Sequence, residues 1–124
     1  MADEGNHRIH QINVHTGNFV KTFGKRGTAE GEFGNPVCVC TDSEGRVVVT
    51  EFRNGRIQVL TKDFKPLLTF GDSGPEKLDH PVGCVCYRNM FIVCDNRNSC
   101  LKVYDCTGTF LYKIEEKGFR RPWD

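Results

Sequence analysis

The sequence has no long apolar run, and this absence limits the classes of protein to which it can belong. No stretch approaches the roughly 18 apolar residues of a membrane-spanning helix, and no N-terminal segment resembles a secretory signal peptide. No segment shows the three-to-four-residue apolar period of a helix. The net charge is only +1 over 124 residues, so overall charge neither favours nor excludes a nucleic acid. We therefore expect a β protein with no membrane partner.

The sequence also lacks an Asn-x-Ser/Thr glycosylation acceptor, and its cysteines do not form a disulfide pattern. There are seven cysteines, an odd number, and several lie inside apolar segments instead of framing loops. Reduced thiols of this kind are typical of proteins in reducing compartments. These features predict a cytoplasmic location.

Two sequence landmarks recur along the chain and indicate an internal repeat. The first is an acidic residue followed three positions later by asparagine, and the second is a proline preceded three positions earlier by an apolar residue. Successive acidic residues lie 48 and 44 residues apart, and successive prolines lie 45 and 41 residues apart. This period is in the range of propeller blades. The acid–asparagine pairs are Asp3 and Asn6, Glu51 and Asn54, and Asp95 and Asn98, and the prolines are Pro36, Pro81 and Pro122.

Each complete repeat is predicted to form four antiparallel strands joined by tight turns. The expected strands are 8–14 and 19–23, then 37–40, 46–50, 56–61 and 66–70, then 82–86, 90–94, 100–104 and 110–114. The predicted organisation is one partial propeller over 1–124, with a half blade at 1–24, blades at 33–71 and 78–114, and the start of another at 119–124. Closed propellers usually have four to eight blades. Because about three stacked repeats are needed for stability, we expect the isolated chain to be marginal and to self-associate.

The first strand of each complete repeat carries small side chains, as the narrow inner edge of a propeller blade requires. Cysteines alternate along these strands, so each Cys-x-Cys pair projects to one face, and a four-thiolate zinc site is one alternative. Structural zinc usually requires a Cys-x₂₋₄-Cys knuckle that wraps the metal. We therefore favour small buried thiols and predict no metal site. The residues concerned are Cys38, Cys40, Gly83, Cys84 and Cys86.

The repeated phrases resemble the NHL repeat. The resemblance rests on Glu-Phe-x-x-Pro at 32–36, Val-Val-Val-Thr-Glu at 47–51, Asn-Gly-Arg-Ile-Gln-Val-Leu at 54–60 and Asn-His-Arg-Ile at 6–9. It implies an all-β partial propeller of four-stranded antiparallel blades, with two full blades and incomplete ends. The chain departs from the pattern at Glu51, where the family usually has Asp, and at Cys100, which replaces the Arg of Asn-x-Arg. That replacement is expected to remove the contact that Arg8 and Arg56 make in the other repeats.

The sequence of Gly24–Pro36 is most similar to that of the C-terminal NHL propellers of tripartite-motif proteins. This resemblance implies that the chain is the target-binding part of a ubiquitin ligase whose RING-type catalytic part lies elsewhere. No catalytic residue and no cofactor are predicted within the chain. The Gly-rich loop lacks the Lys-Ser/Thr and the following helix of a phosphate-binding loop. The histidines, which a Cys–His nucleophile pair would need, have no motif context; they are His7, His10, His15 and His80.

The acid–asparagine pairs can be interpreted as a metal or catalytic constellation, or as a lock for a turn. Aspartate and asparagine bond back to local backbone and tolerate left-handed geometry in turns. Recurrence in every repeat favours the structural interpretation. The predicted structural turn residues are Asp3, Asn6, Glu51, Asn54, Asp95 and Asn98.

Loops that join blades and loops between second and third strands should emerge on one face, which we predict to bind a partner. Basic residues interleaved with aromatics suit single-stranded RNA, through phosphate attraction and base stacking. Acidic residues are as numerous in these loops, however, and this balance favours a protein target. Both partners remain open: target recognition, or RNA binding in post-transcriptional repression. The predicted partner residues are Lys25, Arg26, Phe52, Arg53, Arg97, Arg120, Arg121 and Trp123.

Overall fold

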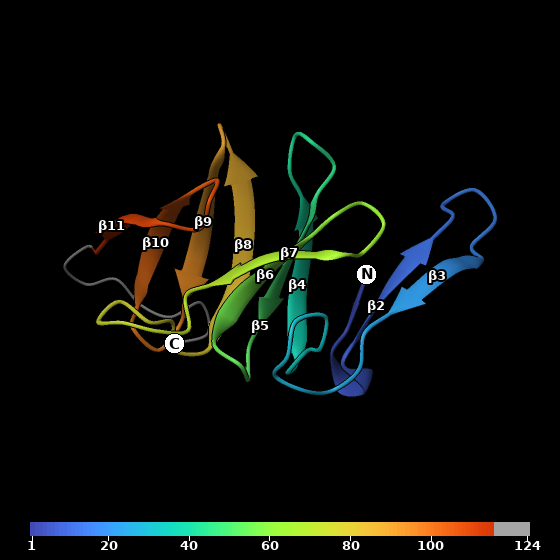
Figure 1. Cartoon of the computed structure of the whole chain (residues 1–124), viewed down its shortest axis with the longest axis horizontal. Coiled ribbons are helices and arrows are strands. Elements are labelled where there is room, and N and C mark those ends of the chain that lie inside the picture. Colours follow the sequence, from blue (N-terminus) through green and yellow to red (C-terminus); the bar gives the residue numbers. More distant parts are fainter. Residues whose placement is uncertain (116–124) are drawn as a thin grey trace.

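The structure is a computed structural model that describes residues 1–115. Three antiparallel sheets stand one beside the next along the chain (Figure 1). The first contains β1 (Ala2–Asp3), β2 (Arg8–Ile12) and β3 (Phe19–Phe23), with a 3-10 turn, η1 (Glu4–Asn6), after β1. The second contains β4 (Pro36–Thr41), β5 (Val47–Glu51), β6 (Arg56–Leu60) and β7 (Pro66–Phe70). The third contains β8 (Pro81–Tyr87), β9 (Met90–Asp95), β10 (Cys100–Asp105) and β11 (Phe110–Ile114).

The strands of the second and third sheets follow one another in chain order, from β4 to β7 and from β8 to β11. This meander of four antiparallel strands is the architecture of a propeller blade, so the predicted fold class is confirmed. Most strands begin and end within two residues of the predicted bounds. The short strand β1 was not predicted, because two residues carry no readable alternation.

Side-chain alternation along the central strands divides the core into two layers between neighbouring sheets. Val47 and Val49 of β5 face the first sheet, whereas Val48 faces the third. Since successive side chains of a strand point to opposite faces, a strand packed on both sides is buried throughout, as β5 is. The apolar residues three positions before the repeated prolines are also buried in these layers. Phe33 packs in the layer between the first and second sheets, and Leu78 packs in the layer between the second and third.

The first strands of the complete blades, β4 and β8, are neighbours at the inner edge of the assembly. The Cys38 thiol lies 3.9 Å from the carbonyl oxygen of Cys84, and the Sγ atoms of Cys40 and Cys86 are 3.4 Å apart. Cysteine therefore stands where adjacent blades approach each other, and all seven cysteines are free thiols.

The blade-connecting loops and the turns between second and third strands lie together at the lower edge of the view in Figure 1. We call this edge the loop face; the hairpins β4–β5 and β8–β9 lie at the opposite edge. Backbone bonds tie the loops to the turns: Phe52 N donates to Asn35 O at 2.9 Å, and Arg97 N donates to Asp79 O at 3.1 Å. Residues 116–124, with the predicted start of another blade, lie outside the described residues.

Candidate functional site

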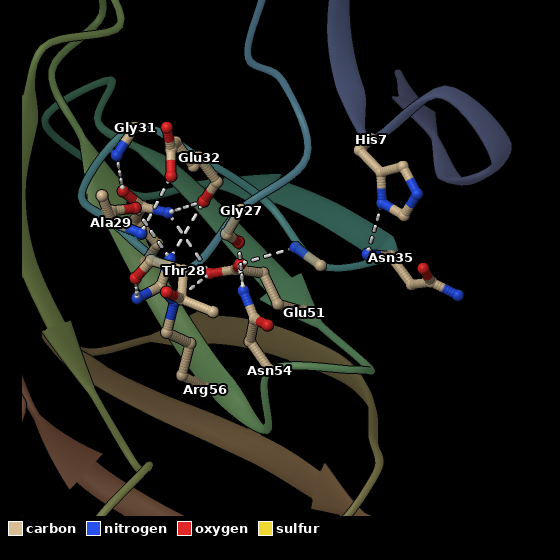
Figure 2. Close-up of polar contacts among 12 residues, drawn as sticks. His7, Gly27, Thr28, Ala29, Gly31, Glu32, Asn35, Glu51, Asn54 and Arg56 are labelled. Atoms are coloured by element: carbon tan, nitrogen blue, oxygen red, sulfur yellow. Dashed lines mark hydrogen bonds and ion pairs between the residues drawn. The ribbon is translucent and has the colours of Figure 1, made fainter.

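The turn that connects β5 to β6 contains a buried polar network centred on Glu51 (Figure 2). Arg56 Nε donates to Glu51 Oε2 at 2.6 Å, and both side chains are almost completely buried. The other carboxylate oxygen accepts from Gly34 N at 3.1 Å and from Asn54 Nδ2 at 2.9 Å. Gln58 Nε2 adds a bond of 3.2 Å to Oε2. A buried carboxylate is costly unless such donors surround it.

The same network holds the loop that enters the second blade. The Arg56 guanidinium donates to three carbonyl oxygens of this loop, those of Thr28 at 2.7 Å, Ala29 at 3.1 Å and Glu32 at 2.9 Å. Asn54 Nδ2 also donates to Gly27 O, at 2.8 Å. Figure 2 shows these loop carbonyls gathered around the guanidinium. The network therefore fixes the position of the loop relative to β6.

The third blade repeats this arrangement with a different cation. Asn98 Nδ2 donates to Asp95 Oδ2 at 2.6 Å, and Lys102 Nζ lies 2.9 Å from the same oxygen. Lys102 also donates to Glu76 O at 2.8 Å and to Lys77 O at 3.3 Å. The Arg contact is lost at position 100, as expected, but Lys102 supplies the cation in its place. Residues two apart on a strand share a face, so Lys102 reaches the site that an Arg at position 100 would occupy.

The first blade uses a histidine for the same purpose. Asp3 accepts from Asn6 Nδ2 at 3.0 Å and lies 2.9 Å from His10 Nε2. The hydrogen bond from Asn6 is the largest cause that lowers the pKa of Asp3. Arg8 is exposed, so the expectation that it matches Arg56 is wrong. Among the described residues, no group of three His, Cys, Asp or Glu side chains is placed to hold a metal.

A cleft of about 270 Å³ opens on the loop face between the second and third blades. One wall is the turn after β5, and the other is the loop that enters β8. The lining is mixed in character, with aromatic, basic and acidic groups together. The lining residues are Phe52, Arg53, Asn54, Gly55, Asp72, Lys77, Leu78, Asp79 and His80.

The two walls of the cleft contact each other through aromatic rings. The rings of Phe52 and His80 lie 4.6 Å apart, edge to face, and His80 Nδ1 bonds to Asp79. Asp79 N donates to Asp95 Oδ1 at 2.8 Å, so the buried network of the third blade holds this wall. Arg53 is exposed at the other wall, where its backbone N–H donates to Gly34 O at 3.0 Å. The cleft is therefore built on anchored backbone with exposed charged groups at its rim.

Of the predicted partner residues that the structure describes, Phe52 and Arg53 alone line this cleft. Lys25 is exposed 3.5 Å from Glu32, and Arg26 and Arg97 are exposed elsewhere on the loop face. The predicted residues Arg120, Arg121 and Trp123 lie outside the described residues.

Sequence reasoning did not single out His80, Leu78 or Asp79 as part of a site. The signal available was position: His80 directly precedes a repeated proline, as Asn35 does, and both have positive φ, of 56° and 54°. Such a residue ends the blade-connecting loop beside the turn of the preceding blade. Its side chain therefore faces the residues that follow β5.

Comparison with known proteins identifies the repeat. The model of the NHL repeat family matches residues 33–60, which include Glu51, Asn54 and Arg56 of the buried network. Residues 33–60 are thus an NHL repeat, and the chain that contains them is folded as β-propeller blades. Protein lin-41 of Caenorhabditis elegans is 43% identical over 44 residues, 36% of this chain and 4% of that protein. NHL-repeat-containing protein 4 of Mus musculus is 29% identical over 87 residues, 68% of this chain and 61% of that protein. The chain thus spans less than two thirds of the length of either relative.

Solved structures support the same fold. The structure of U3-55K aligns with a TM-score of 0.70 and 16% sequence identity, over 93% of this chain and 35% of that chain. A streptogramin B lyase aligns with a TM-score of 0.66 and 18% identity, over 91% and 35% respectively. At these identities the likeness establishes the propeller fold alone. Within residues 1–115, no helix is long and apolar enough to cross a membrane.

Proposed function

We propose that this chain is a non-catalytic recognition module whose cleft beside Phe52 and His80 binds a protein target. The observation that carries this proposal is the cleft of about 270 Å³ on the loop face, whose wall combines an aromatic pair with groups of both charges. Aromatic and arginine side chains at the centre of a contact supply most of the binding energy in protein interfaces. Phe52 and Arg53 both line the cleft, which supports this role for them.

The charges of the cleft favour a protein over a nucleic acid. Arg53 and Lys77 line it together with Asp72 and Asp79, so its lining carries equal numbers of basic and acidic side chains. Phosphate groups would meet two carboxylates in this space, whereas a peptide with mixed charge can pair with both signs. Interfaces between proteins have this mixed, polar rim.

We further propose that the module selects targets for a tripartite-motif-like ubiquitin ligase. The support is the wording of Gly24–Pro36, which resembles the propellers of that group. Arg56 anchors this loop through Thr28, Ala29 and Glu32. In this proposal the ligase chemistry belongs to a RING part outside the chain, and the propeller supplies the target.

Affinity capture from cytoplasmic extract, followed by mass spectrometry, tests the proposal. The bait is the full propeller, as wild type, Phe52→Ala, Arg53→Ala or Arg88→Ala. Arg88 is exposed in the β8–β9 hairpin, at the edge opposite the loop face, and is the matched control. A protein captured after ribonuclease treatment by wild type and Arg88→Ala, but lost from the other two, supports the cleft. Capture that is equal for all four baits contradicts it.

Single-stranded RNA is the second candidate, because Lys25, Arg26, Arg53 and Arg97 are all exposed on the loop face. Fluorescence anisotropy with a labelled single-stranded RNA pool tests it at 50 and 200 mM salt. RNA binding through phosphates should weaken steeply with salt, and further with Arg53→Ala plus Arg97→Ala. An absence of RNA binding at the lower salt concentration rejects this candidate and leaves the protein target.

A further inference from the structure

Four cysteine residues meet where the innermost strands of the second and third blades run side by side. Cys38 and Cys40 lie on β4, and Cys84 and Cys86 lie on β8. The shortest approach is between Cys40 Sγ and Cys86 Sγ, at 3.4 Å, and these sulfurs belong to neighbouring blades. A disulfide needs an S–S separation of about 2.05 Å, so a closure of about 1.4 Å would join them.

The chemistry of these thiols differs from one to the next. Hydrogen bonding with the Cys84 thiol, and then with Cys86, lowers the pKa of Cys40 to about 7, against the effect of burial. The same contacts, together with burial, raise the pKa of Cys84. Thiolates, not thiols, react with peroxides. Cys40 is therefore the sulfur that reacts with peroxide, and Cys84 remains a thiol, whose Sγ donates to Val85 O at 3.8 Å.

Cys86 is also accessible from one edge of the protein. Cys86 lines a cavity of about 80 Å³ between the β4–β5 and β8–β9 hairpins, opposite the loop face. Cys40 is half-buried beside it. A water molecule occupies about 30 Å³ in the liquid, so a molecule of two oxygens fits this volume. Asp42 and Arg46 supply polar groups at the cavity wall.

We propose that Cys40 and Cys86 form a reversible, peroxide-driven disulfide that joins the second and third blades at their inner strands. The Cys40 thiolate attacks one oxygen of hydrogen peroxide, giving a sulfenic acid and hydroxide. The Cys86 sulfur then attacks the Cys40 sulfur and displaces a second hydroxide. The proton of the Cys86 thiol and one from solvent convert the two hydroxides to water. Peroxide gains two electrons, and the two sulfurs lose one each.

Among the described residues, the two blades meet at this edge through side-chain packing and through the contact from the Cys38 thiol to the Cys84 carbonyl oxygen, and the disulfide adds a covalent link. A cross-link between residues 40 and 86 restricts the unfolded chain and resists separation of β4 from β8. Thiol reductants reverse it. Oxidation therefore stiffens the joint between blades without altering the loop face.

Peptide mapping of the oxidised full chain tests the proposal. The folded chain is treated with hydrogen peroxide, the excess is removed with catalase, and free thiols are alkylated before trypsin digestion. The expected product is peptide 27–46 linked to peptide 78–88, with fragment ions that place the bond between Cys40 and Cys86. The mass of the linked product should be two hydrogens below the sum of the two reduced peptides, and dithiothreitol should separate them. The thermal midpoint of the oxidised chain should rise by several degrees.

Four alanine variants distinguish this bond from others. Cys40→Ala and Cys86→Ala should abolish both the linked peptides and the thermal shift. Cys94→Ala should retain both, because Cys94 of β9 does not line the cavity. Cys84→Ala should retain both but form the bond more slowly, because it removes the largest cause of the low pKa of Cys40. Circular dichroism checks that each variant keeps its β structure. A bond to Cys84, sulfinic acid without a bridge, or a bridge between two chains would each overturn the proposal.

Discussion

Arg56 holds the second blade and its entering loop together, so replacing it by methionine tests the role of the buried network. Methionine keeps the length of the side chain and its contacts with apolar neighbours while removing every donor. Glu51 would retain its bonds from Gly34 N, Asn54 Nδ2 and Gln58 Nε2, but would lose its ion pair with Arg56. Three loop carbonyl oxygens would lose a donor at the same time.

The magnitude follows from these losses. Removing one partner of a buried ion pair costs about 3–5 kcal/mol, because the other charge stays buried without compensation. The three remaining donors to Glu51 reduce that cost, whereas each carbonyl that loses its bond adds about 1 kcal/mol. We expect Arg56→Met to lower the free energy of unfolding by about 3–5 kcal/mol. This is a large part of the roughly 5–15 kcal/mol of a typical domain.

Urea unfolding followed by circular dichroism measures the effect. With a slope of about 1–3 kcal/mol per molar urea, the midpoint should fall by at least about 1 M. Arg53→Met is the matched control, because Arg53 is an exposed arginine of the same turn and should change stability by no more than about 0.5 kcal/mol. Glu51→Gln combined with Arg56→Met should cost less than Arg56→Met alone, since it buries no charge. If Arg56→Met costs no more than Arg53→Met, the network does not hold the blade.

Lys102→Met removes the equivalent cation of the third blade and should cost a similar 3–5 kcal/mol in the same urea assay; a loss below 1 kcal/mol would show that the lysine is dispensable. Gly24→Ala should destabilise by several kcal/mol more than Gly45→Ala, because both have positive φ but only at Gly24 would a Cβ lie 2.4 Å from the Phe33 ring; equal midpoints would refute this. The hydrogen bond from the Thr107 side chain is the largest cause that lowers the pKa of Asp105 below its unfolded value of about 3.9, so its stabilisation is complete above that pH and lost as pH falls further. The stability difference between wild type and Asp105→Asn should therefore shrink below pH 4 in urea titrations, and a constant difference would contradict the sign. Sedimentation of the isolated chain should show concentration-dependent association, whereas a monomer at every concentration would contradict the predicted self-association.

Most of the fold could be predicted because the signals that define it are local. Alternating residues mark the strands, and turns such as Asn54-Gly55 end them without help from distant parts of the chain. The repeat then sets the order of strands within each blade. The strand β1 escaped prediction because its two residues are ordered by pairing with Arg8 and Ile9, and not by a pattern of their own.

The site was less predictable because it depends on contacts between separate repeats. Phe52 and Arg53 were found from composition, but their partner His80 comes from a loop some 28 residues later. The exchange of Arg for Lys102 two positions further along the strand was also missed. Matching repeats position by position compares residue types, whereas the carboxylate requires only a cation that reaches it from the same face. Two positions on one strand face satisfy that requirement equally.

The turn from Glu51 to Arg56 combines residues of the buried network with residues that line the proposed binding cleft. Glu51, Asn54 and Arg56 bond beneath the loop, whereas Phe52 and Arg53 are directed toward the cleft. The inward residues fix the backbone that carries the outward ones. Binding of a partner at the cleft would therefore cost little conformational entropy of the backbone. Substitutions in this turn should therefore divide into two classes. Changes at the inward positions lower stability first, and changes at the outward positions lower binding while leaving the urea midpoint in place.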